Sequence, residues 1–259
     1  MPEPLYCAIA VVDIEGFGKR NDTDQGTLRR DLHAALAEAL GAEGVDWSAL
    51  DPKDTGDGAI LRIPASVPKT AITRALSWKL HTALVRRCLA EVPVEEMRVR
   101  VALHGGEITE DEIGLRGTDL NTASRLVDAQ QLRDVLAAAA RSHVAVIVSD
   151  AWYRAVVRHG YEGIAAESFA PVRISIKELR ETAWVTVPGL STPPGLPPFE
   201  PDQAPSAPTG VAPAGSAAQA PAAPGSRSLV IHGPVQEVTQ GDKNIKNIYG
   251  GFGPNAAVR

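Results

Sequence analysis

The chain has 259 residues, a length that allows one substantial domain with extensions or two small domains. Its residues are 44% hydrophobic and 22% charged, and its formal net charge is −5, so it has no basic surplus with which to bind nucleic acid. The apolar run at residues 5–12 is too short for a membrane span and follows no basic segment. We therefore expect a cytoplasmic protein that binds neither nucleic acid nor membrane, with Cys7 and Cys88 as reduced thiols.

Composition divides the chain into three zones. Residues 1–190 mix apolar runs typical of strands with amphipathic stretches typical of helices. Residues 191–227 consist mainly of Pro, Ala, Gly and Ser, and such a segment buries too little apolar surface to offset its ordering entropy. We expect an extended, disordered linker there. Residues 228–259 regain Val, Ile and Tyr but are too few to form a core of their own.

Hydrophobic periodicity predicts alternating strands and helices in the first zone. Residues 5–13 form a continuous apolar run that ends in an acid, which is typical of a strand buried on both faces. Residues 24–40 place leucines at helical spacing, and Gly41 is expected to end that helix. Further strands are predicted at 59–63, 98–107, 144–148, 172–176 and 183–187, and further helices at 68–89, from about 117, and at 150–158. This mixed order predicts an α+β fold with helices covering one sheet.

Two stretches combine a carboxylate with glycines at the end of a predicted strand or turn. In the first, Asp13 ends the buried strand, and Gly16 and Gly18 follow it. Glycines at such positions let backbone amides approach a phosphate or a metal ligand closely. In the second, a Gly-Asp-Gly turn presents Asp54 and Asp57 before the next strand.

A third stretch opens a helix on which Asn121 and Arg125, four residues apart, share one face. Carboxylates from neighbouring strands, Asp13 and Asp57, can hold Mg²⁺ or Mn²⁺ through oxygen ligands. Two such ions suit phosphoryl chemistry, because one activates the attacking oxygen and the other neutralises the triphosphate. An Arg and an Asn on one helix face supply donors for charge that develops on a transferring phosphorus.

Together and in this order, the three stretches resemble the class III adenylate and guanylate cyclase homology domain. In that family the first strand typically ends in Asp-Ile-x-Gly-Phe, the hairpin carries Lys-x-x-Gly-Asp and a later helix carries Gly-x-x-x-Asn-x-Ala-x-Arg. The matching positions are Asp13, Ile14, Gly16 and Phe17, then Lys53, Gly56 and Asp57, and then Gly117, Asn121, Ala123 and Arg125. The resemblance covers residues 5–188, and the Ala-, Arg- and Pro-rich text fits an actinobacterial subgroup of cyclase-like proteins. It implies a ferredoxin-like βααββαβ sandwich.

The resemblance also implies an enzyme, a phosphorus-oxygen lyase that converts a nucleoside triphosphate to a 3′,5′-cyclic nucleotide and pyrophosphate. Asp13 and Asp57, with Ile14, would bind two Mg²⁺ or Mn²⁺ ions. Asn121 would orient the ribose, and Arg125 would stabilise the pentavalent phosphorus. Family members work as head-to-tail dimers in which one chain supplies the aspartates and the other the Asn and Arg, so a homodimer is expected.

Further substrate contacts follow from the same resemblance. The backbone amides of Ile14, Glu15, Gly16 and Phe17 would cradle the triphosphate. Lys177, or alternatively Arg180, stands where the family places a lysine that contacts a phosphate.

The base-reading positions depart from the family pattern. Lys53 occupies the position of a lysine that reads adenine, but its aspartate partner is replaced by Gly114, which has no side chain to hydrogen-bond. Asp111, Glu112 and Asp119 are alternatives on the same loop. The base is therefore open between ATP, GTP, UTP and CTP, and pyrimidine cyclases of bacterial antiphage systems share this domain.

The approach to the hairpin also departs, because Pro52 precedes Lys53 and makes the strand there short or places it at an edge. These departures keep a second hypothesis open. In it the domain is a catalytically weak or inactive scaffold that binds a nucleotide and acts through its tail.

The tail at 228–259 contains two short β-prone stretches. It resembles bacterial amyloid signalling motifs of the RHIM-like kind. The matching positions would be Val238, Gln240, Gly241, Asp242 and Asn244. The resemblance implies recruitment of an effector or sensor protein that carries a similar motif, and a disordered tail is the alternative.

Overall fold

Strand β1 (Leu5–Ile14) is an interior strand of an eight-stranded sheet. The computed structural model describes residues 2–50, 52–89, 96–177 and 179–199. The linker from residue 200 onward and the predicted motif at 228–259 lie outside these residues. β1 pairs antiparallel with both β3 (Gly58–Pro64) and β4 (Val99–Glu110), and its apolar stretch from Cys7 to Val12 is buried on both faces.

The sheet has the strand order β2-β3-β1-β4-β6-β8-β7, and β5 pairs with β4 outside this path. The remaining strands are β2 (Lys53–Asp54), β5 (Leu115–Arg116), β6 (Val144–Ser149), β7 (Ala170–Ile176) and β8 (Leu179–Thr186). Only the β4–β6 pairing is parallel among the described strands. β2 is a two-residue strand at the edge, as the proline before Lys53 predicts.

The first part of the sheet has the ferredoxin-like arrangement that the sequence predicts. Its elements run β1, α1 (Asp22–Gly41), β2, β3, α2 (Lys69–Arg74) with α3 (Leu80–Cys88), and β4, and the strands lie in the order β2-β3-β1-β4. The predicted pattern has two helices between its first two strands. The structure instead has the single long helix α1 there, followed by a short 3₁₀ turn at Trp47–Ala49.

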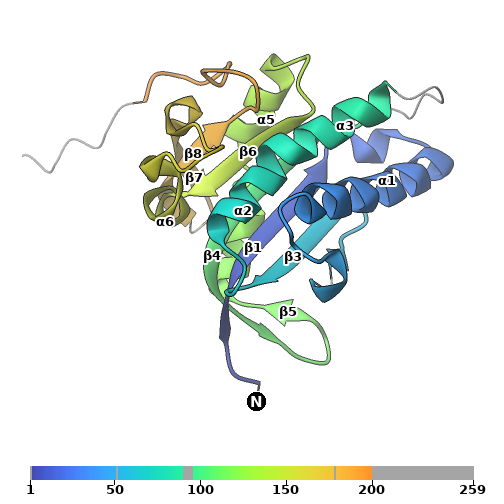
Figure 1. Ribbon diagram of the computed structural model, residues 1–259, viewed down its shortest axis with the longest axis vertical. Helices are drawn as coiled ribbons and strands as arrows, with labels where there is room; N and C mark the ends of the chain where they lie inside the picture. Colours follow the sequence, from blue (N-terminus) through green and yellow to red (C-terminus); the bar gives the residue numbers. More distant parts are fainter. Residues whose placement is uncertain (1, 51, 90–95, 178, 200–259) are drawn as a thin grey trace, which may run out of the picture. The chain divides into compact units, whose positions relative to one another are not determined.

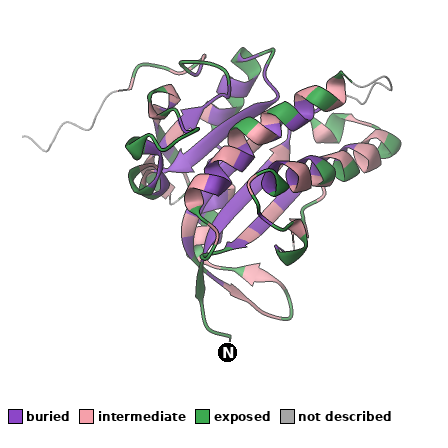
Figure 2. Ribbon diagram, viewed as in Figure 1, coloured by how far each residue is buried: buried purple, intermediate pink, exposed green. Residues whose placement is uncertain are grey.

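Helices cover both faces of the sheet. On the face that Figure 1 shows in front, α1, α2 and α3 pack over alternate residues of β1 such as Ala10 and Val12. On the other face, α4 (Thr118–Val127) and α5 (Gln130–Ala138) pack over Ile9 and Val11. Figure 2 shows the buried residues along the strands and on the helix sides that face them. The α+β prediction is therefore confirmed.

Helix α1 shows how local sequence sets these elements. Asn21 caps it by accepting a hydrogen bond from the Asp24 amide (3.0 Å), so the helix begins two residues before the predicted start. The predicted leucine stripe faces the core, because Leu28 to Leu40 at four-residue intervals are all buried. Gly41 is the last helical residue.

The predicted helix at 68–89 is interrupted by a π-helical turn at Ala75–Lys79 that joins α2 to α3. Pro68, predicted in the first turn, occupies the N-cap position directly before Lys69 and makes no side-chain cap hydrogen bond. The predicted helix at 150–158 is shorter, because α6 (Asp150–Ala155) gives way to a 3₁₀ turn at Val157–His159.

The first residues of the predicted linker contact the domain, because Pro193 is buried and Leu196 packs against the α4–α5 side of the core. Cys7 and Cys88 are free thiols, as expected. No helix within the described part of the chain is long and apolar enough to cross a membrane.

Candidate active site

Asp13 and Asp57 lie next to each other at one end of the sheet. Asp13 is the penultimate residue of β1 and pairs with Gly58, which directly follows Asp57. The Ile14 amide donates to the Asp57 carbonyl (2.8 Å), which fixes the hairpin against the end of β1. Gly56, with a φ of +94°, makes the left-handed turn that positions Asp57.

Gly58 allows this close approach of β1 and the hairpin. A Cβ at this position would lie 1.9 Å from the carbonyl oxygen of Val12, a distance that no side chain tolerates. The Gly-Asp-Gly turn of the sequence is therefore a requirement of strand packing as well as of turn geometry.

Arg100, which the sequence analysis did not single out, is the ion-pair partner of Asp13. It pairs with Asp13 across β1 and β4, and its Nη2 lies 2.8 Å from Asp13 Oδ1. Both side chains are largely buried, at 11% exposure for Arg100 and 18% for Asp13. The sequence does show a basic residue within the strand predicted at 98–107, but the side chain with which it pairs depends on strand register.

Burial and neighbouring carboxylates both disfavour the charged form of Asp13. Burial raises the pKa of the Asp13 carboxyl, and the nearby Arg100 opposes that rise. The negative charges of Asp57 and of Asp128, which follows α4, raise the Asp13 pKa further. In addition, Nε of Arg100 is buried and finds no hydrogen-bond partner among the described residues. Asp13 thus lies near two further carboxylates, and Arg100 is its buried cationic partner.

The donor set fits a divalent cation that also binds a phosphate. Carboxylate oxygens of Asp13 and Asp57, with backbone carbonyl oxygen near Ile14, are ligands that Mg²⁺ and Mn²⁺ prefer. Within the described residues, no group of three or more His, Cys, Asp or Glu side chains could hold an ion. Mg²⁺ commonly binds through one or two carboxylates plus substrate phosphates and water, so this set suits an ion that arrives with a nucleotide.

The loop after β1 uses part of its backbone inside the fold. The Ile14 amide donates to Asp57, and the Glu15 amide donates to the Arg98 carbonyl (2.8 Å). The Glu15 carboxylate also pairs with Arg98 (3.0 Å). Gly16 has a left-handed φ of +68° and leads into the 3₁₀ turn Phe17–Lys19. Two of the four predicted phosphate-binding amides are therefore occupied by bonds that hold the loop.

Asn121 and Arg125 lie on α4, which packs over β1 and β4. Asn121 is exposed and Arg125 is half-buried. The helix begins after Gly117, whose φ of +155° and tight contact (2.8 Å from a Cβ to the Glu107 carbonyl oxygen) leave no room for another residue. The glycine that leads this motif is thus required by its close approach to β4.

Lys177 lies far from the two aspartates within one chain. It is exposed, has a left-handed φ of 52°, and sits in the turn between β7 and β8 at the other edge of the sheet. The register places Asp13 level with Arg100 and Ala145, near the start of β6, whereas Ser149 at the end of β6 pairs with Ala183. The β7–β8 turn is therefore at the opposite end of the sheet. Arg180, the alternative, donates to Ser175 (3.0 Å).

Gly114, which stands where the family has a base-reading aspartate, lies in the loop between β4 and β5. Gly114 has a φ of +143°, and nothing lies within 4 Å of a Cβ placed there. Asp111 accepts from the Ile113 and Gly114 amides and from Arg116, and these bonds lower its pKa. Glu112 is exposed.

Asp119, another of the alternatives, points back into the fold. Its carboxylate accepts from the Glu107 amide (2.7 Å) and lies 3.2 Å from Nε2 of the buried His104. A Cβ at Gly106 would lie 2.1 Å from the Asp119 carboxyl carbon, so Gly106 makes room for it.

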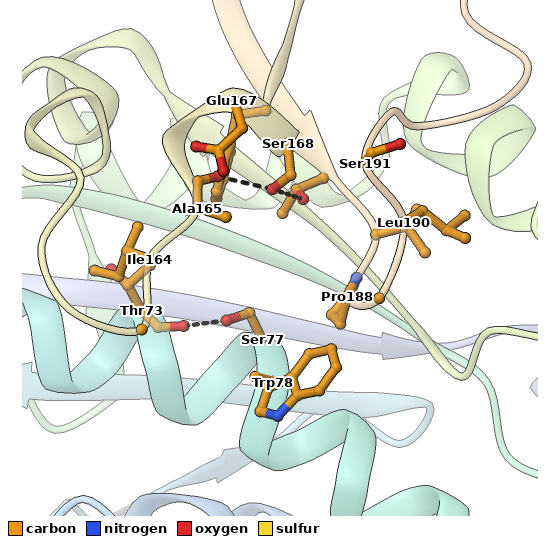
Figure 3. A pocket seen from close by; sticks show the side chains of 15 residues that line it. Thr73, Ser77, Trp78, Ile164, Ala165, Glu167, Ser168, Pro188, Leu190 and Ser191 are labelled. Atoms are coloured by element: carbon orange, nitrogen blue, oxygen red, sulfur yellow. Dashed lines mark hydrogen bonds between the residues drawn. The ribbon is translucent and has the colours of Figure 1, made fainter.

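A separate cavity of about 300 Å³ lies beside the π-helical turn. Figure 3 shows Thr73, Ser77 and Trp78 on one side of it and Glu167, Ser168 and Leu190 on the others. Its lining includes none of the predicted site residues, so the cavity and the aspartates are different features of the molecule.

The strand order, the helices on both faces and the paired strand ends define the fold, which is that of class III adenylate and guanylate cyclase domains. Among solved structures, the chain is similar to an adenylate/guanylate cyclase/hydrolase from Silicibacter pomeroyi. The two are 22% identical, the match covers 73% of this chain and 99% of that one, and the TM-score is 0.51.

A bacterial light-regulated adenylyl cyclase also matches with a TM-score of 0.51, at 15% identity over 73% of this chain and 53% of that one. At these identities the likeness establishes the fold. No protein-family model and no curated protein matches the chain.

Proposed function

We propose that the chain is a metal-dependent nucleotidyl cyclase that converts a nucleoside triphosphate to a 3′,5′-cyclic nucleotide and pyrophosphate. The observation that supports it most directly is the pairing of β1 with the hairpin, which puts Asp13 and Asp57 side by side on a cyclase fold. In the proposed reaction the ribose 3′-oxygen bonds to the α-phosphorus, and the bond from that phosphorus to the bridging oxygen breaks. The hydroxyl proton passes to solvent, and pyrophosphate leaves.

In this proposal the residues position the substrate rather than react with it. Asp13, Asp57 and the Ile14 carbonyl would hold two Mg²⁺ or Mn²⁺ ions, which when bound activate the hydroxyl and neutralise the triphosphate. The amides of Gly16 and Phe17 would contact the phosphates, because those of Ile14 and Glu15 donate within the fold.

Asn121 and Arg125 would come from a second copy of the chain in a head-to-tail homodimer. Two such chains would form two composite sites. The distance of Lys177 from Asp13 along one sheet supports this assembly, because that lysine would reach a phosphate only in the partner's site.

A second candidate function is a catalytically weak or inactive scaffold that binds a nucleotide. The observation that favours it is the Asp13–Arg100 ion pair, in which a guanidinium already occupies a carboxylate needed for a metal ion. Gly114, which offers no side chain where the family has a base-reading aspartate, also favours the scaffold function.

One experiment separates the two. The purified full chain is incubated with each of the four NTPs and Mn²⁺, and cyclic products are identified by mass spectrometry. The Asp57→Asn variant is expected to lose at least about a hundredfold in product, because one of the two carboxylate ligands of the proposed metal ions is gone. The Asp134→Asn variant, changed on the exposed face of α5, serves as the control and should match the parent. Absence of product with every NTP would leave the scaffold function.

For the C-terminal segment 228–259 we propose recruitment of an effector or sensor protein, and for the cyclase a role in bacterial signalling or antiphage defence. The support is the sequence pattern alone. The isolated peptide is expected to form fibres that bind thioflavin, and a peptide that stays monomeric would contradict this role.

A further inference from the structure

Three polar side chains form a hydrogen-bonded row behind the start of α4. Nδ1 of His104, on β4, lies 2.8 Å from the hydroxyl oxygen of Ser149, the last residue of β6. Nε2 of the same ring lies 3.2 Å from Oδ1 of Asp119, in the first turn of α4. Ser149 is 1% exposed and His104 is 7% exposed, so both are shielded from water. We call these three side chains the polar row.

The partners assign the direction of each hydrogen bond in the polar row. A carboxylate only accepts, so Nε2 carries the proton that faces Asp119, and Nδ1 of the neutral ring accepts from the Ser149 hydroxyl. The Ser149 oxygen accepts in turn from the Trp152 amide (3.3 Å) and caps α6. The second Asp119 oxygen accepts from the Glu107 amide (2.7 Å). Each member of the row therefore has partners that hold it in place.

The polar row is not a hydrolytic site, although hydrolases also use serine, histidine and aspartate in hydrogen-bonded order. Ser149 is 1% exposed and its oxygen caps a helix, so a substrate does not reach it. The end of the row that reaches solvent is Asp119, whose side chain is 36% exposed. Any functional effect of the row therefore passes through the start of α4.

Asp119 supplies what the N-terminus of α4 otherwise lacks. Gly117, which precedes the helix, has no side chain with which to cap it. Asp119 ties the first turn to β4, because its two oxygens accept from the Glu107 amide and from His104. Gly106 leaves the space for this contact, since a Cβ there would lie 2.1 Å from the Asp119 carboxyl carbon.

Asn121 and Arg125 lie on the helix whose start is held in this way. Asn121 follows Asp119 by two residues, and its amide donates to the Gly117 carbonyl (3.2 Å). Arg125 lies one turn further along the same face. Because α4 has only 10 residues, a shift of its first turn displaces both side chains together.

We propose that His104 is a positioning residue of the cyclase site, which holds Asp119 and so fixes the direction in which α4 presents Asn121 and Arg125. The inference rests on the proposed cyclase function. Misplacing a group that acts on the transition state by about 1 Å costs on the order of a hundredfold in rate. The phosphates and metal ions would still bind at Asp13 and Asp57, so loss of His104 should affect turnover more than substrate binding.

Steady-state kinetics of the full-length chain with Mn²⁺ and each NTP test the proposal. His104→Leu removes both ring nitrogens and should lower kcat at least about tenfold while KM changes less than about threefold. His104→Gln keeps an N–H donor for Asp119 and should keep kcat within about threefold of the parent. Thr73→Val, which removes a buried hydrogen bond to Trp152 on the other face of the sheet, is the control and should keep both constants. Unchanged kcat in His104→Leu, or an equal loss in Thr73→Val, overturns the proposal.

A further variant covers the case in which His104→Leu does not fold, which thermal melts reveal. Asp119→Ala breaks the same contact at the more exposed end of the polar row and should give the same loss of kcat. Parental kcat in Asp119→Ala would overturn the proposal.

Mixing experiments locate the loss in the half of the site that α4 provides. His104→Leu keeps both metal-binding aspartates, so an equimolar mixture with Asp57→Asn should recover up to about a quarter of the parental rate. A mixture with Arg125→Ala should recover nothing, because both defects then lie in the same half. A chain that is merely destabilised would not distinguish the two partners. Recovery with both partners, or with neither while Asp57→Asn and Arg125→Ala restore each other, overturns the proposal.

Hydrogen exchange separates failure of this inference from failure of the cyclase proposal, because it needs no turnover. The amides of Glu107 and Asn121 should exchange at least about tenfold faster in His104→Leu than in the parent, whereas those of α1 should be unchanged. Faster exchange without product from any NTP keeps the role of His104 in holding α4 and rejects turnover. Unchanged exchange together with unchanged kcat rejects that role and keeps the enzyme.

Discussion

Arg100 and Asp13 face each other across β4 and β1, and the guanidinium lies 2.8 Å from the carboxylate that a catalytic metal ion would need. Asp57 and Asp128 add negative charge to the same corner. Arg100 is thus the cation beside Asp13 in this structure, and in the proposed cyclase the binding of a metal ion would require this pair to loosen.

Replacing Arg100 tests this competition. Arg100→Met should lower the free energy of unfolding in EDTA by on the order of 3 kcal/mol, because it leaves a largely buried carboxylate unpaired. Added Mn²⁺ should raise the melting temperature of the variant more than that of the parent. Scanning calorimetry with and without Mn²⁺ measures both effects. Arg29→Met, which breaks the more exposed pair with Asp54, is the control and should cost less than about 1 kcal/mol. Equal responses to Mn²⁺ would contradict the competition.

A composite site predicts that two inactive variants restore each other. Asp57→Asn and Arg125→Ala should each be inactive alone, whereas an equimolar mixture should recover up to about a quarter of the parental rate, because half of the dimers then hold one intact site. Product formation is followed by mass spectrometry after mixing and exchange. A mixture no more active than either variant would argue against a site shared between copies.

Gly58 should tolerate no side chain. Gly58→Ala is expected to destabilise the fold by about 3 kcal/mol, because the new Cβ would meet the Val12 carbonyl oxygen at 1.9 Å and force the strands apart. Urea denaturation measures the loss. Gly18→Ala, where nothing lies within 4 Å of the new Cβ, should stay within about 0.5 kcal/mol of the parent. Similar values for the two variants would refute the packing argument.

Glu181 predicts a pH dependence of stability. Burial, and then the negative charge of Asp150, raise its pKa in the folded chain, and its Oε1 has no hydrogen-bond partner among the described residues. A raised carboxyl pKa gives stability that is fully present at low pH and is lost as pH rises through the unfolded pKa toward the folded one.

Glu181→Gln should therefore be more stable than the parent at pH 8, by about 1 kcal/mol, because a neutral amide avoids the cost of the half-buried charge. The difference should vanish near pH 3.5, where the parental carboxyl is protonated in both states. Denaturant titrations at the two pH values measure it. A constant difference across pH would exclude titration of Glu181 as the cause.

The elements that the sequence predicted correctly are those set by hydrophobic periodicity within a single strand or helix. The apolar run at 5–13 forms an interior strand, and the leucine stripe of α1 faces the core, because each pattern is decided within one element. The sequence did not predict the partners of Asp13 and Lys53. Arg100 meets Asp13 through strand register, and Glu110 meets Lys53 because β4 runs on to meet the hairpin. Such contacts depend on how distant segments are aligned, which a single sequence does not encode locally.

The π-helical turn at Ala75–Lys79 has a consequence for how this chain is compared with others. A π turn contains one residue more than a regular turn, and each residue rotates a helix by about 100°. Deleting one residue there would turn α3 and take Leu80 and Leu84 off the core that they now fill. An alignment that passes through this segment without a one-residue gap will therefore match the wrong face of α3 in any cyclase domain that lacks the turn.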